Sequence, residues 1–288
     1  MQKMTENTNP LQKYYRQPQI YVKLPSGGKW YGPEVFTPTE NGEIPILPMT
    51  AKDELAFKTP DALISGQATV DVIKSCVPNF KDPWQMVNFD TDTILLAIRI
   101  ASYGETMNID YTVPVTNEQA STTLNLPAML EDLSKVKIAD SCKTKAGFVI
   151  KLAPLRYNQL TQIILAQYEQ QRVYASAVAS NVNDVTRSKT FAESFKKLNE
   201  LNFDMLIKSV ASITTPDNVE VNDKNQIIEF LSNAPSDMVD EIQTELAKVR
   251  GQAQTPPLKI KATEEQIKKG VSATFEVPVT FDNSNFFG

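Results

Sequence analysis

Prolines interrupt an otherwise helical stretch of the chain, residues 43–104. Apolar side chains recur there at helical spacing, but a proline or a glycine follows every few residues. Proline has no backbone N–H, and its ring clashes with the preceding turn, so a helix ends at or before it. The stretch therefore predicts several short helices that pack as a fixed cluster and excludes one long helix. The residues that divide it are Pro45, Pro48, Pro60, Gly66, Pro78 and Pro83.

Capping residues predict where the helices of this cluster begin. Thr50 is followed three residues later by Asp53, a pair that starts a helix running to about Lys58. Asp90 is expected to cap a further helix over residues 91–103. Because the positive end of a helix dipole favours an acidic side chain, we interpret Asp90 as a cap in preference to a cation ligand.

Extended segments lie on both sides of the cluster. Apolar and polar residues alternate over residues 20–24, a tight turn follows at 25–28, and residues 30–36 continue as an extended segment. This order predicts a hairpin. Segments 105–126 and 148–152 are expected to be extended as well, and together these segments predict a small β part.

A short repeat links the middle of the chain to its end. Residues 111–116 and 275–280 each carry an aromatic residue, a gap of one residue and then Val-Pro-Val-Thr. As extended segments, the two copies are expected to lie side by side. The end of the chain would then return to its middle.

Residues 155–251 have a helical pattern almost throughout, which predicts a helical insertion in an α+β protein. Thr190 and Glu193 cap a long helix that is expected to include Val210 and to close at Pro216. The apolar stripes of these helices have two interpretations, a surface that packs against a partner helix and the core of a bundle, and we favour the core. The expected divisions are an N-terminal arm and hairpin (1–42), the helical cluster with β segments (43–154), the helical insertion (155–251), and a linker with a C-terminal strand that returns to the core (252–288).

The chain contains no histidine and only two cysteines, Cys76 and Cys142. Histidine is the commonest general base and metal ligand, so its absence removes the usual nucleophilic and metal chemistry. Two widely separated thiols cannot form a metal site alone, and we interpret both as packing residues. No two carboxylates have a spacing that predicts catalysis. Acids distant in the sequence can still meet in space, so a carboxylate-dependent hydrolase stays an alternative.

The formal net charge is −5 and the pI is about 5.1, which gives no general attraction to nucleic acid. Lys13, Arg16, Lys23 and Lys29 make the N-terminal strip mildly basic, and we interpret this strip as a solvated face. The N-terminus is polar, and the most apolar run, residues 94–100, is too short to cross a bilayer. We therefore expect no nucleic-acid partner, no membrane insertion and a cytoplasmic protein.

Three runs in the first half of the chain, ELAFKTPDALISGQA, SCVPNFKDPW and ILLAIRIASYG, resemble the signature of the T4-type bacteriophage baseplate hub family. The run from Pro278 to Phe287 is similar to the family's C-terminal pattern P-V-x-F-D-x-S-x-F-F. Many members carry a zinc ribbon built from a C-P-x-C motif and a second C-x-x-C before the terminal pattern. Here residues 113–116 are Val-Pro-Val-Thr, and cysteines are missing from the second position too. The resemblance therefore implies a ribbon that has lost its zinc but keeps its strand pairing, and a protein without a cofactor.

The resemblance also implies a function. It points to a baseplate hub assembly protein that acts by protein–protein contact, as a chaperone-like and non-catalytic factor. The alternatives are a structural hub component retained in the virion and the carboxylate-dependent cell-wall hydrolase. The implied partners are other phage tail and baseplate hub proteins, met in the host cytoplasm during assembly or in the virion tail, and the oligomeric state is left open.

The helical cluster would be the partner-binding platform. Each candidate residue there also has a simpler interpretation in the core or in a turn. The final aromatic pair is expected to be buried, either in the protein's own core, which we favour, or in another subunit. The candidate partner-binding residues are Lys58, Thr59, Pro60, Asp61, Cys76, Pro78, Trp84, Arg99, Phe286 and Phe287.

Overall fold

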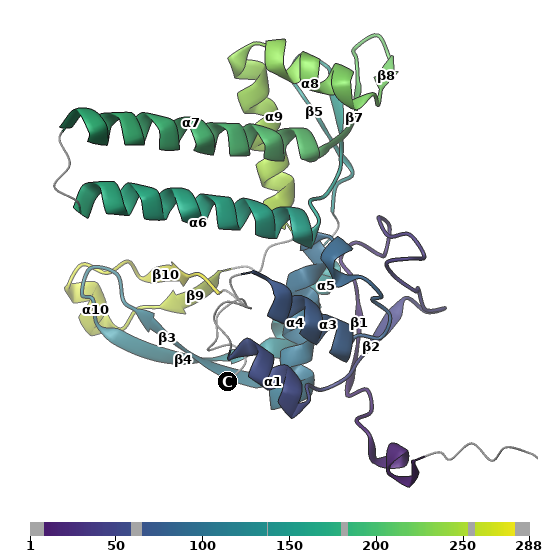
Figure 1. Ribbon diagram of the computed structural model, residues 1–288. Coiled ribbons are helices and arrows are strands. Elements are labelled where there is room, and N and C mark those ends of the chain that lie inside the picture. The colour runs from purple at the N-terminus through teal and green to yellow at the C-terminus, as the bar shows by residue number, and fades with distance from the viewer. Residues whose placement is uncertain (1–8, 59–64, 137, 180–183, 253–256, 280–288) are drawn as a thin grey trace, which may run out of the picture.

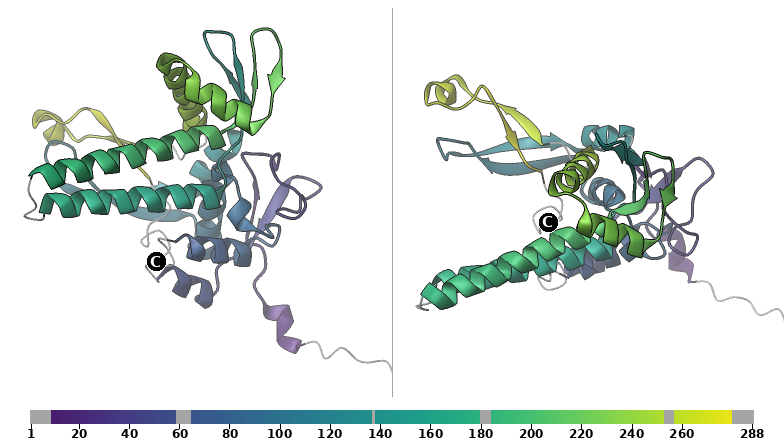
Figure 2. Two further views of the ribbon diagram at one scale, coloured as in Figure 1. Left: turned by 45° about the horizontal axis from the view of Figure 1, so that its top comes forward. Right: turned by 90° about the horizontal axis from the view of Figure 1, so that it is seen from above.

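The computed structural model of the chain describes residues 9–58, 65–136, 138–179, 184–252 and 257–279. It is an α+β structure, as the sequence predicts, with a helical body and several small antiparallel sheets (Figure 1). Two arms extend from the body and diverge from each other. One is made of two long helices and the other of β-hairpins (Figure 2).

The body contains the predicted cluster of short helices. Its first helix starts at the predicted capping box, in which Thr50 and Asp53 exchange hydrogen bonds. The next helix ends at the residue before Val77, so the proline that follows is outside it. The helices of the cluster are α1 (Ala51–Phe57), α3 (Gln67–Cys76), the short 3-10 helix η2 (Pro83–Gln85), α4 (Asn88–Tyr103) and α5 (Leu126–Lys135).

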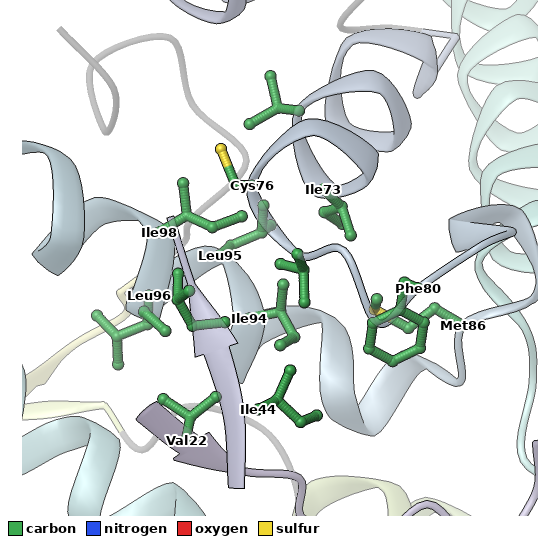
Figure 3. Packing of buried hydrophobic residues seen from close by; sticks show 14 of the residues in the cluster. Val22, Ile44, Ile73, Cys76, Phe80, Met86, Ile94, Leu95, Leu96 and Ile98 are labelled. Atoms are coloured by element: carbon green, nitrogen blue, oxygen red, sulfur yellow. The ribbon is translucent and has the colours of Figure 1, made fainter. Parts of the chain in front are cut away.

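Helix α4 forms the centre of the main hydrophobic core. Its residues 93–98 are all buried. The apolar residues among them, 94–98, share one cluster with Ile73 and Cys76 of α3 and with Val22 and Ile44 of the neighbouring strands (Figure 3). A helix that is apolar on all sides must be covered on all sides, so the surrounding elements are organised by α4.

The predicted N-terminal hairpin is wrong in its second strand. Strand β1 (Ile20–Lys23) pairs antiparallel with β2 (Glu43–Ile46), and residues 30–36 do not pair with it. That segment instead packs on the cluster, where the backbones of Phe36 and Phe80 form an isolated β-bridge and the centroids of their rings lie 4.8 Å apart. Burying these aromatic rings stabilises the connection more than a second strand in solvent would.

A four-stranded antiparallel sheet, in the order β5-β6-β7-β8, forms the second part of the body. The sequence predicts helix through Val210, but helix α7 ends at Lys208 and a strand follows, so this prediction is wrong. Ile213 of that strand lies opposite Ile150, and both are buried. β-branched residues fit a strand well once a neighbouring strand is available. The elements are β5 (Ser141–Lys143), β6 (Val149–Leu152), β7 (Val210–Thr214), β8 (Glu220–Val221), α8 (Lys224–Asn233) and α9 (Ser236–Gln252).

The helical arm consists of α6 (Tyr157–Ala179) and α7 (Asp184–Lys208), which run antiparallel (Figures 1 and 2). Arg156 anchors its base to the body. The guanidinium donates to the carbonyl oxygen of Gln85 at 2.7 Å and to that of Trp30 at 3.1 Å. The arm is thereby fixed where it leaves the helical cluster.

The β arm contains two hairpins that pack against each other. The predicted contact between the repeats is present at their aromatic residues, because the rings of Tyr111 and Phe275 lie 5.9 Å apart. The strands that carry them do not pair, however: each pairs within its own hairpin, so the implied strand pairing between the repeats is wrong. The elements are β3 (Thr106–Thr112), β4 (Gln119–Asn125), β9 (Leu258–Lys261), α10 (Glu264–Lys268) and β10 (Thr274–Val277); the remaining 3-10 helix, η1 (Pro10–Tyr14), precedes β1.

Candidate interaction surface

Arg16 ties the N-terminal segment to the helical cluster. Its guanidinium donates to the carbonyl oxygens of Pro48 and Ser75, both at 2.6 Å, and pairs with Asp53 Oδ2 at 3.2 Å. The Arg16 side chain is 23% exposed, so the interpretation of this strip as solvated is wrong at this residue. Two carbonyls and a carboxylate converge there, and a forked, permanently charged guanidinium can satisfy all three.

Replacing Arg16 with alanine is expected to lower the free energy of unfolding by about 2 kcal/mol, because it leaves a nearly buried carboxylate without its cation. Urea denaturation measures this. Lys23→Ala is the matched control, since the Lys23–Glu43 pair is exposed and 3.8 Å apart. That control is expected to change stability by less than about 0.5 kcal/mol. Equal effects of the two variants would contradict the anchoring role of Arg16.

Cys76 lies beside this ion pair. Its side chain is fully buried, and Arg16 Nη1 is 3.6 Å from Sγ. Burial, and then the charge of Asp53, raise the pKa of the thiol to about 12. The thiol is therefore neutral at pH 7 and is suited to packing, not to nucleophilic attack.

Asp90 does not cap α4, contrary to the sequence prediction. The helix begins earlier, at Asn88 after Val87, and Asp90 is fully buried in its first turn. Its Oδ1 accepts from the backbone N–H of Ser26 at 2.9 Å, and its Oδ2 accepts from the hydroxyls of Ser26 and Tyr31, both at 2.5 Å. Asp90 thus holds the connection between β1 and β2 against the central helix.

The stability of the fold is expected to depend on the protonation of Asp90. Burial raises the pKa of its carboxyl from 3.8 to about 6, although the three hydrogen bonds act in the opposite direction. Because the folded protein then binds this proton more tightly than the unfolded chain, the part of the stability that comes from binding the proton is full below about pH 4. It is lost as the pH rises through about 6. Urea denaturation across this pH range is expected to show that the free energy of unfolding of the wild type falls as the pH rises. The Asp90→Asn variant is expected not to show this decrease. Parallel pH curves for the two proteins would contradict this assignment.

The described candidate residues of the cluster have different environments. Lys58, after α1, and Pro78, after α3, are exposed. Trp84 is half-buried, and its ring lies 5.8 Å from that of Tyr157 at the base of the helical arm. No hydrogen bond or ion pair joins these residues to one another within the part of the chain that the structure describes.

Arg99, near the end of α4, is a half-buried cation. Its guanidinium lies over the ring of Tyr103, 4.5 Å from the centroid, and its Nε and Nη1 are buried with no hydrogen-bond partner among the described residues. Burial lowers the pKa of Arg99, and burial together with Glu54 raises the pKa of Tyr103. Five further candidates lie outside the described residues: Thr59, Pro60, Asp61, Phe286 and Phe287.

Exposed apolar side chains on the helical arm are a feature that the sequence interpretation placed in a core. Ile164, Tyr168 and Phe195 of the helical arm were assigned to a bundle core, but they are 52%, 53% and 60% exposed. The available signal was the composition of α6, which has very few charged residues for a surface helix. The N-terminal segment exposes further large side chains, namely Leu11, Tyr14, Tyr15 and Tyr21.

The turn between β3 and β4 occupies the position of the first zinc motif. Val113 is fully buried there and shares a small apolar cluster with Val271 and Phe275. Zinc sites in proteins are built from thiolate, imidazole and carboxylate groups. None of the four motif positions, 113–116, carries such a group, and the carboxylate of Glu118, later in the same turn, pairs with Lys269 at 2.7 Å. Across the described residues, no three His, Cys, Asp or Glu side chains are grouped to hold a metal ion. The residues present therefore do not fit zinc.

Within the described residues, no helix is both long and apolar enough to cross a membrane. The structure defines an α+β protein with large apolar side chains exposed on its helical arm and its N-terminal segment. The chain belongs to the T4 bacteriophage base plate protein family, whose model matches residues 17–287. No curated protein and no solved structure shows significant similarity to it. It is thus a phage baseplate protein.

Proposed function

We propose that the protein acts in the assembly of the baseplate hub, through protein–protein contact and without catalysis, as a chaperone-like factor. The observation that carries this proposal is the exposure of Ile164, Tyr168 and Phe195 on a helical arm that the body holds away from itself. Ordering such side chains in water has no benefit for the isolated chain, whereas a partner surface would bury them. The partners are other phage tail and baseplate hub proteins.

The chemistry of the ionisable groups supports a function that depends on protein–protein contact and not on catalysis. The sequence has no histidine, and Asp90, whose pKa is raised to about 6, is fully buried and enclosed by its own hydrogen-bond donors. Cys76 is kept neutral by burial. We also infer that the protein works without a metal cofactor, because an apolar cluster around Val113 links the hairpins.

Capture of tail components, combined with mass spectrometry of purified particles, tests this proposal. The tagged chain is expected to bind tail-tip proteins from an infected host and to be far below stoichiometric in finished virions. Stoichiometric presence in virions would favour the structural alternative and overturn the chaperone-like role. If the chain bound no tail-tip component, the proposed function through protein–protein contact would be overturned. It would also be overturned if the chain hydrolysed peptidoglycan and a single carboxylate substitution abolished this activity.

A further inference from the structure

Arg99 of α4 carries buried hydrogen-bond donors that the described residues do not satisfy. Its Nε and Nη1 are both buried and have no acceptor within the described ranges. A buried donor on a charged group costs free energy until an acceptor reaches it, and a carboxylate is the strongest acceptor for a guanidinium. Nε and Nη1 lie on different edges of the planar group, so both are satisfied only by several acceptors. A peptide segment with one carboxylate and its own backbone carbonyls offers such a set.

The surroundings of Arg99 are aromatic and apolar. The guanidinium lies over the ring of Tyr103, 4.5 Å from the centroid. Glu54 of α1 accepts a hydrogen bond from Tyr103, so the acid on this neighbouring helix is engaged there. Tyr103 is 38% exposed and Leu55, next to Glu54, is 64% exposed. A segment that fits this site should therefore bring apolar side chains together with its carboxylate.

The β arm leads the chain back to this end of α4. Strand β3 begins at residue 106, shortly after α4 ends at residue 103, and runs outwards from the body (Figure 1). At the outer end of the arm, Lys269 pairs with Glu118 in the turn between β3 and β4 at 2.7 Å. Strand β10 follows Lys269 and returns inwards. Val279 then packs against the main hydrophobic core, as Met107 at the start of β3 does. Residues 280–288 therefore begin close to the end of α4.

We propose that residues 280–288 bind along the end of α4 and that Asp282 supplies the carboxylate for Arg99. Asp282 is the only acidic residue in this segment. It follows Val279 by three residues, which span at most about 10 Å. Arg99 lies one turn before Tyr103, about 6 Å along α4, so it is within that reach.

The other side chains of the segment suit this site. Three of the nine residues are phenylalanines, at positions 281, 286 and 287. Their rings would cover the exposed parts of Tyr103 and Leu55 and exclude water from the ion pair, which strengthens it. The contact lies within one chain and is separate from hub binding, so its failure would leave the proposed function standing.

Hydrogen exchange of the full chain tests the proposal. In the wild type, the amides of residues 280–288 are expected to be protected. Asp282→Asn keeps the size of the side chain but removes its charge, and it is expected to accelerate exchange of these amides at least tenfold. Asp61→Asn is the matched control, because Asp61 is another acid outside the described residues and follows α1. It is expected to change the exchange rates less than twofold. Circular dichroism confirms that every variant is folded.

A double-mutant cycle shows whether Asp282 acts through Arg99. Arg99→Gln alone is expected to accelerate exchange of the same amides as much as Asp282→Asn, and the two together are expected to add less than twofold to either. Fully independent effects of the two substitutions would overturn the proposal, because the side chains would then not interact. Wild-type amides at 280–288 that exchange at the rate of an unfolded peptide would overturn it too. So would an Asp61→Asn effect as large as that of Asp282→Asn, since the charge of Asp282 would then have no special role.

Discussion

Asp90→Ala is expected to lower the free energy of unfolding by about 3–5 kcal/mol. The substitution removes the acceptor for three donors, the backbone N–H and the hydroxyl of Ser26 and the hydroxyl of Tyr31. Each buried donor left without a partner costs about 1–3 kcal/mol, and rotation of the hydroxyls recovers part of this cost. The Tyr31 hydroxyl also accepts from the backbone N–H of Val87 at 3.0 Å, so the start of α4 is affected as well.

Urea denaturation at pH 7 measures this effect. Asp71→Ala is the matched control, because Asp71 lies on the exposed side of α3 and bonds only to the exposed side chain of Gln67 among the contacts that the structure describes. The control is expected to stay within about 0.5 kcal/mol of the wild type. If Asp90→Ala matched the control, the carboxylate would not be the link between the β1–β2 connection and α4.

Val113→Asp is expected to separate the two hairpins of the β arm. Val113 is fully buried with Val271 and Phe275, so a carboxylate at this position would lie in an apolar cluster. Burying an unpaired charge costs several kcal/mol, so the arm opens locally. We expect hydrogen exchange of the amides in β9 and β10 to accelerate at least about 100-fold, which corresponds to about 3 kcal/mol.

Val115→Asp, in the same turn, is the control for this measurement. Val115 is 69% exposed, and its φ of 69° lies in a region that a β-branched residue adopts poorly and aspartate tolerates better. In the control variant, the amides of both hairpins are therefore expected to be protected from hydrogen exchange as well as in the wild type, or slightly better. Unchanged exchange in Val113→Asp would show that the small cluster does not hold the hairpins together.

Local signals in the sequence were sufficient where one short segment decides its own structure. The capping pair of Thr50 and Asp53 predicts the start of α1, and the same pattern at Thr263 and Gln266 precedes α10. Gly104 ends α4 as predicted, with a φ of 94° that favours glycine. These features depend on backbone groups a few residues apart, so their spacing in the sequence is enough.

The candidate surface was predicted less well. The helical cluster was recognised, but Arg16 and Asp90 received surface or capping roles, and the apolar residues of the helical arm were assigned to a core. Arg16 meets groups 32 to 59 residues away, and Asp90 meets groups about 60 residues away. Nothing in the neighbouring sequence distinguishes a buried acid with distant donors from a helix cap.

The amino-acid order alone determined the short helices, the caps of α1 and α10, the α+β class and the lack of histidine chemistry, because each follows from the properties of neighbouring residues. The tertiary structure decided which strands pair, that Val210 joins a sheet and that Val113 fills the site of the first zinc motif. It also decided that Ile164, Tyr168 and Phe195 remain exposed. Strand partners and burial depend on contacts between distant segments, and those contacts exist only once α4 has gathered the rest of the chain around it.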